Sequence, residues 1–243
     1  MRYLIPILAA ILSICTTAQA QTISVSHFHK VIISPYIQVT FVQGDEESVT
    51  INNIIVDSSK LHVEVHSGTL RMYLDGAKEI PKNQRDDNGH SSHSLYPNHA
   101  VIATVTYRDL DALSLRGAET HLCKSPLSAE EFTLRLYGES TVILIEAHID
   151  EMHTTMYGES SLEIKAGAVN KQNYTCYGEG KVNTTAINGE EAKLTAYGES
   201  EFAMNVSDRI KITAFGEAKL HYKGNPTIVK GIHIGEMQVK KLD

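Results

Sequence analysis

"LRLYGEST" at residues 134–141 decides the fold, because variants of this stretch recur along the second half of the chain. An aromatic residue, a glycine and a glutamate follow one another again in "TTMYGESS" (154–161), "YTCYGEGK" (174–181), "LTAYGESE" (194–201) and "ITAFGEAK" (212–219). Seven aligned glycines lie 18 to 21 residues apart: Gly117, Gly138, Gly158, Gly178, Gly198, Gly216 and Gly235. Such a period indicates a solenoid, in which stacked repeats bury the apolar face that one repeat cannot bury alone.

Apolar and polar residues alternate on both sides of each glycine. Leu134 and Leu136 precede Gly138 by four and two residues, and the polar Arg135 lies between them. This period of two is typical of strands, and no helix-length pattern accompanies it. We therefore predict an all-β parallel β-helix with coils of about twenty residues, stacked about 4.8 Å apart. The glycine is expected at a corner, where a residue without a Cβ turns sharply at little cost.

The chain divides into three parts. Residues 1–20 combine a short basic start, an apolar run and "AQA" at 18–20, which is the pattern of a signal peptide. Residues 21–112 form a less regular β region, interrupted by the charged, turn-rich segment 78–99, which we predict to be an exposed loop. Residues 113–243 hold the repeats and are expected to continue from the region before them.

Composition and cysteine content limit the function. The net charge of −7 disfavours nucleic acid as a partner. No apolar run reaches the roughly 20 residues of a membrane-spanning helix, so no transmembrane segment is predicted. Cys123 and Cys176 are expected to face inward about three coils apart, as buried free thiols rather than a disulfide. The histidines carry no zinc-site spacing, and we assign them no metal.

Two further stretches, "FHKVIISPYIQVTFVQGDEESVTI" (28–51) and "ATVTYRDLDALSLRGAET" (103–120), give the chain a family resemblance together with the repeats. It resembles the putative auto-transporter adhesin, head GIN domain proteins, which Gram-negative bacteria export. The resemblance implies a right-handed parallel β-helix and an adhesin-like role, with no catalytic residues to carry over. Family members often have small residues around the corner glycine, where this chain has Tyr-Gly-Glu.

Stacked coils would line up like residues, and this predicts a candidate binding face. It comprises Tyr137, Tyr157, Tyr177, Tyr197, Glu139, Glu159, Glu179, Glu199 and Glu217. Aromatic rings with hydroxyls beside carboxylates suit contact with sugars, but tyrosines at strand corners more often pack as a ring stack over the seam between coils. Adjacent carboxylates repel, and relief could come from exposure to water, from Lys181 and Lys219, or from bound Ca²⁺.

The preferred interpretation is a non-catalytic adhesin that binds a glycan or a cell-surface protein, without a cofactor. It would be exported to the periplasm, the outer-membrane surface or the medium. A lipid anchor at Cys15 is not expected, because the bulky Ile14 precedes it. The alternatives are a polysaccharide-active β-helix enzyme, a lyase or hydrolase, and a structural envelope component. Parallel files of one residue do not place two carboxylates on opposite sides of a bond, which a glycosidase needs.

Overall fold

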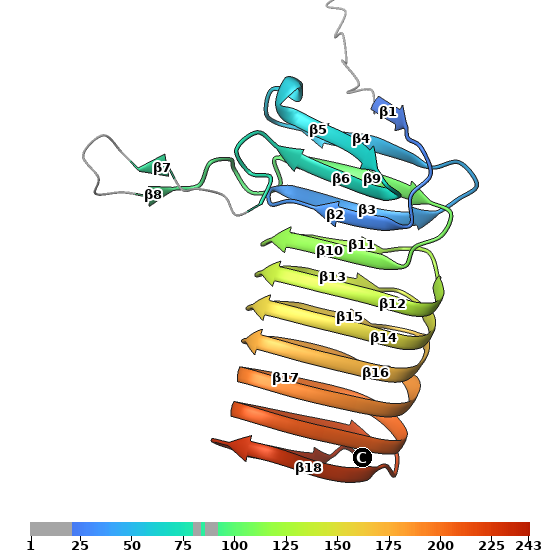
Figure 1. The fold of residues 1–243 in the computed structure, drawn as a ribbon, viewed down its shortest axis with the longest axis vertical. Coiled ribbons are helices and arrows are strands. Elements are labelled where there is room, and N and C mark those ends of the chain that lie inside the picture. The colour runs from blue at the N-terminus through green and yellow to red at the C-terminus, as the bar shows by residue number, and fades with distance from the viewer. Residues whose placement is uncertain (1–20, 80–83, 86–91) are drawn as a thin grey trace, which may run out of the picture.

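The computed structural model describes residues 21–79, 84–85 and 92–243. Stacked coils form a β-solenoid of about six turns, which confirms the predicted fold class. Figure 1 shows the coils lying one above another below a β unit built from the first part of the chain. The one helical turn among the described residues is the 3-10 segment η1 (Ser58–Lys60).

The coils between residues 127 and 178 each contain a long strand and a short one, whereas the following coils share one continuous strand, residues 180–223. The strands pair in parallel, and the register joins residues twenty apart, such as Leu134 with Thr154 and Thr154 with Tyr174. The last coils shorten, since Arg209 pairs with Thr227. The strands are β12 (Leu127–Gly138), β13 (Thr141–Leu144), β14 (Ala147–Gly158), β15 (Ser161–Ile164), β16 (Gly167–Gly178), β17 (Gly180–Lys223), β18 (Thr227–Ile234) and β19 (Met237–Lys241).

The first part of the chain is a mixed β unit continuous with the solenoid. Antiparallel pairs join β1 to β4, β4 to β9 and β5 to β6, whereas β2 and β3 pair in parallel with β10 and β11 of the next coil. The strands are β1 (Gln21–Ser24), β2 (Lys30–Ile33), β3 (Ile37–Gln43), β4 (Ser48–Ile54), β5 (Leu61–His66), β6 (Thr69–Leu74), β9 (Val101–Tyr107), β10 (Ala112–Gly117) and β11 (Thr120–Cys123).

The segment 78–99 leaves this unit and returns to it. Its short strands β7 (Gln84–Arg85) and β8 (Ser92–His93) pair with each other beside the stack (Figure 1), while 80–83 and 86–91 lie outside the described residues. Near its end Tyr96 is buried edge-on against Tyr36, with ring centroids 5.7 Å apart. The Tyr96 hydroxyl donates to the carbonyl oxygen of Asp75 at 2.9 Å. The last residues of this segment are therefore anchored to the fold.

The interior of the coils follows the predicted alternation. Leu134 and Leu136 are fully buried, and Arg135 between them is exposed. Cys123 and Cys176 are buried free thiols, as predicted. Burial raises the pKa of Cys123 to about 12 and that of Cys176 to about 11, so neither sulfur is poised for chemistry. The inward positions therefore build a core and leave the outward positions for contacts.

Candidate functional site

The repeated glycines form a file along one corner of the solenoid. All of them have positive φ, from 91° at Gly158 to 131° at Gly216. A Cβ on Gly158 would lie 2.6 Å from the carbonyl oxygen of Gly138, and the same contact recurs at the next coils. That oxygen accepts a hydrogen bond from the backbone N–H of Glu159 at 2.9 Å. This glycine file (Gly117, Gly138, Gly158, Gly178, Gly198 and Gly216) is thus a bare strip of backbone, which confirms the predicted corner.

The residues before these glycines form a continuous ring stack. Successive ring centroids lie 4.9 to 5.1 Å apart, with interplanar angles of 3° to 7°. The rings face outward, and Tyr157, Tyr177 and Tyr197 remain about two-fifths exposed: 39%, 42% and 41%. Because each inner ring is covered on both faces, solvent and ligands reach ring edges and hydroxyls rather than ring faces. We call this row the tyrosine file (Tyr137, Tyr157, Tyr177, Tyr197 and Phe215).

An arginine ends the tyrosine file at the first coil. Arg116 is in register with Tyr137, and its guanidinium lies 5.4 Å from that ring's centroid, a cation–π contact. Glu79 accepts hydrogen bonds from both Arg71 and Arg116, and these ion pairs hold the pKa of Glu79 below its usual range. The arginine therefore covers the exposed face of Tyr137 and ties the file to the segment at residue 79.

The residues after the glycines form a row of exposed carboxylates, the glutamate file (Glu139, Glu159, Glu179, Glu199 and Glu217). Exposure to water lowers the repulsion between neighbouring charges, since the permittivity there is high. Lys181 and Lys219 share with the last three of these glutamates a shallow hollow of about 250 Å³. The glutamate file is thus a solvated acidic ridge with two lysines beside its lower half.

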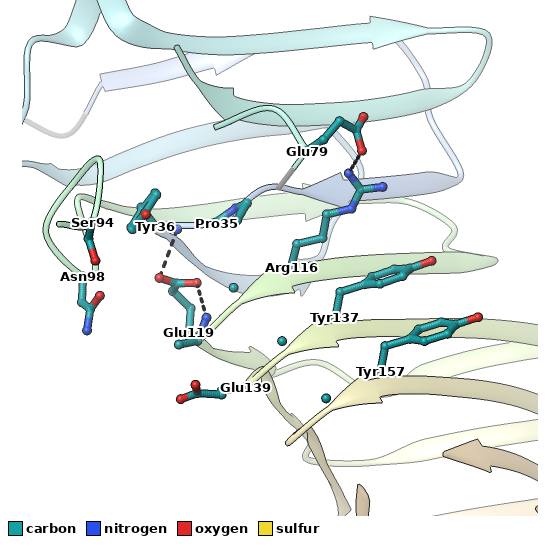
Figure 2. A pocket seen from close by; sticks show the side chains of 14 residues that line it. Pro35, Tyr36, Glu79, Ser94, Asn98, Arg116, Glu119, Tyr137, Glu139 and Tyr157 are labelled. Carbon is teal, nitrogen blue, oxygen red and sulfur yellow. Dashed lines mark hydrogen bonds and ion pairs between the residues drawn. The ribbon is translucent and has the colours of Figure 1, made fainter. Parts of the chain in front are cut away.

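The tyrosine and glutamate files border a hollow of about 690 Å³ where the solenoid meets the first β unit. Figure 2 shows its layout, with Arg116, Tyr137 and Tyr157 on one side of the glycine corner and Glu119 and Glu139 on the other. Ser94 and Asn98, from the returning end of the segment 78–99, lie beyond Glu119. Gly117, Gly138 and Gly158 provide the floor between them. This corner hollow brings together part of the predicted face and residues far away in the sequence.

Glu119 is one of the residues of this site that the sequence prediction missed. Its position corresponds to Ser140, Ser160, Gly180, Ser200 and Ala218 in later coils, so a carboxylate breaks a column of small residues. It is only 2% exposed, and it accepts hydrogen bonds from the N–H groups of Tyr36 at 3.1 Å and Ala118 at 3.0 Å. Burial raises the pKa of the Glu119 carboxyl, and these hydrogen bonds oppose that shift. The break in the repeat was the available signal.

The described residues form neither a metal cluster nor a membrane-spanning helix. No three His, Cys, Asp or Glu side chains in 21–79, 84–85 and 92–243 are grouped closely enough to hold a metal ion. Within the same ranges, no helix is long and apolar enough to cross a bilayer. The predicted binding residues, members of the tyrosine and glutamate files, would therefore act through their own side chains, which point outward from successive coils.

Known structures share this fold across almost the whole chain. A putative adhesin from Bacteroides fragilis NCTC 9343 has a TM-score of 0.69 at 15% identity, covering 92% of this chain and 96% of that one. A putative adhesin from Parabacteroides merdae ATCC 43184 has a TM-score of 0.64 at 16% identity, covering 93% and 96%. A putative lipid binding protein from Parabacteroides distasonis ATCC 8503 has a TM-score of 0.66 at 18% identity, with coverage of 93% and 96%. No curated protein matches.

A family model agrees with these likenesses in fold and with the resemblance seen in the sequence. It matches residues 27–226, which include the mixed β unit from β2 onward, the corner hollow and nearly all the repeats. The coils before β18 and the whole glycine file thus lie within the matched range. The chain belongs to the putative auto-transporter adhesin, head GIN domain family.

Proposed function

We propose that this chain is an exported, non-catalytic adhesin that binds a glycan or a cell-surface protein along the Tyr-Gly-Glu corner. The corner hollow carries the proposal. Its volume of about 690 Å³ lies within the range of roughly 300–1,000 Å³ that is typical of ligand sites. Exposed carboxylates and tyrosine edges border it, and these groups hydrogen-bond hydroxyl-rich surfaces.

Export is part of the same proposal. The pattern of residues 1–20, which lie outside the described residues, supports a cleaved signal peptide without a lipid anchor at Cys15. The mature protein would then lie in the periplasm, on the outer-membrane surface or in the medium. A rigid solenoid suits such exposed locations, because its backbone hydrogen bonds are paired from coil to coil.

A glycan array with the purified protein tests binding, and a conservative double variant tests the face. Tyr157→Phe with Glu159→Gln removes a hydroxyl and a charge but keeps the ring stack, since Phe215 already occupies the same file. We expect affinity for the bound glycan to fall about tenfold, the loss of one or two net hydrogen bonds. Glu130→Gln removes an exposed charge outside the files and should bind like the wild type.

Equal binding by the double variant and the wild type would show that the ligand uses another face. Absence of binding to any glycan, together with absence of binding to immobilised cell-surface glycoproteins, would instead favour the structural envelope role. The circular dichroism spectrum of each variant provides the folding control. The experiment therefore tests the contribution of the corner residues to binding, separately from their contribution to stability.

One observation favours a second candidate, a polysaccharide-active enzyme. Glu119 lines the hollow with a raised carboxyl pKa, which suits a general acid. Under this function, Glu119→Gln would abolish the release of reducing ends from a bound polysaccharide and leave its affinity within about twofold of the wild type, because glutamine retains the side-chain shape. Wild-type protein that binds the polysaccharide but releases no reducing ends contradicts this candidate.

A further inference from the structure

The corner hollow runs across coils rather than along one strand. Three consecutive coils contribute equivalent residues to it: Arg116 and Gly117, then Tyr137 and Gly138, then Tyr157 and Gly158. The strand register places these residues directly over one another. A ligand that follows the hollow therefore lies parallel to the solenoid axis and meets a new, equivalent set of groups at each coil.

The floor and the borders of the hollow differ in polarity. Along the floor, the carbonyl oxygen of Gly117 already accepts from the backbone N–H of Glu139 at 2.8 Å and from the Ser140 hydroxyl at 3.1 Å. The free polar groups belong to the tyrosine and glutamate files on either side. A pyranose ring has this distribution too, because its C–H groups lie on its faces and its hydroxyls lie around its edge. A sugar laid flat on the glycine file would thus direct its hydroxyls to both files.

The spacing between successive coils along the files favours an extended polymer as the ligand. Their pitch is 4.9 to 5.1 Å, measured between stacked rings. An extended β-1,4-linked pyranose chain advances by one ring length per sugar, from O1 to O4, which is close to this pitch. An extended peptide advances by only about 3.3 Å per residue, so its residues do not match the spacing between coils. Each sugar of a linear β-1,4-linked glycan therefore meets one coil, and alternate sugars are turned over, so that their hydroxyls still point to both files.

The negative charge of the glutamate file limits which glycans the corner can bind. Five exposed carboxylates follow one side of the glycine file, and Lys181 and Lys219 are the lysines that line a hollow with them. Such a row repels uronic-acid or sulfated polymers and tolerates neutral or amino-bearing ones. We propose that the corner binds a linear, neutral or amino-bearing β-1,4-linked glycan along the solenoid axis, with one sugar per coil. This inference rests on the proposed binding function of the corner.

Chain length provides the test. Isothermal titration with cello-oligosaccharides and glucosamine oligosaccharides of two to six sugars should show affinity rising about two- to tenfold with each sugar, because each coil adds at least one net hydrogen bond. Maltohexaose, which is α-linked and coiled, should bind no better than a disaccharide. Tyr197→Phe with Glu199→Gln alters a coil beyond the hollow. This variant should lose the gain from the last sugars and keep the disaccharide affinity.

The outcomes separate this inference from the broader proposal. Affinity independent of chain length, or equal affinity for maltohexaose, overturns the axial arrangement and leaves glycan binding at the corner in place. Binding confined to acidic glycans overturns the charge argument. If none of these oligosaccharides binds while an array glycan or a cell-surface glycoprotein does, the inference fails and the proposed function stands. The variant at Glu130, an exposed residue outside both files, should reproduce the wild-type length dependence throughout.

Discussion

Gly158→Val is expected to lower the free energy of unfolding by roughly 4 kcal/mol, because two costs add at this position. The residue has φ of 91°, which a β-branched side chain adopts only with strain. Its Cβ would also lie 2.6 Å from the carbonyl oxygen and 3.2 Å from the carbonyl carbon of Gly138. That oxygen is the acceptor that joins the two coils, so it has little freedom to move. Urea denaturation followed by circular dichroism measures the loss.

Two companion variants isolate the cause. Gly158→Ala introduces the Cβ alone and should already show most of the destabilisation. Thr155→Val places the same valine in the same strand, β14, and should change stability by less than about 0.5 kcal/mol. A Gly158→Val protein as stable as the wild type would mean that the corner can open between coils, contrary to the register described above.

Acid should destabilise this protein through one buried histidine. His121 is fully buried, and burial lowers its pKa from 6.5 to about 3. Its Nδ1 accepts from the backbone N–H of Val39 at 3.3 Å, and its Nε2 has no hydrogen-bond partner among the described residues. The unfolded chain binds a proton below pH 6.5 whereas the folded chain does not, so stability is full above 6.5 and falls as the pH drops towards 3. At pH 5 the loss is about 2 kcal/mol.

His121→Leu is the variant that tests this. The register places Val142 and Leu162 at the same position in the next two coils, so an aliphatic side chain suits this column. The free energy of unfolding, measured from pH 7 to pH 4, should fall less steeply for the variant than for the wild type. Other groups titrate alike in both proteins and cancel. Parallel pH profiles would assign acid sensitivity to other residues, whatever the stability of the variant at pH 7.

The repeat made the regular part of the fold predictable. Each repeat holds the same apolar columns around its glycine, so one correct alignment placed Leu134 and Leu136 inside and Tyr137 outside. The same alignment put the tyrosines and glutamates in files, because coils that stack in register leave like residues no other arrangement. The tight stacking of the rings was among the alternatives, and the ring geometry selects it.

The corner hollow was not predictable in the same way. It depends on Tyr36, Glu79 and Asn98, which come from the irregular part of the chain and reach the corner only through the mixed β unit. Antiparallel pairs such as β5 with β6 leave no periodic trace that would fix their place relative to the coils. Glu119 was detectable in the sequence, since it interrupts a column of small residues. A prediction built on the residues that recur in every coil omits a residue that occurs in only one.

The coil-to-coil register has a consequence for how such proteins diversify. Every regular coil touches chiefly the ones before and after it, so duplicating a stretch such as residues 159–178 adds one rung without disturbing the others. The new rung brings its own tyrosine, glycine and glutamate to the corner. Tandem duplication and deletion in the gene can therefore adjust the reach of the molecule in steps of one rung, while the mixed β unit at its head stays as it is.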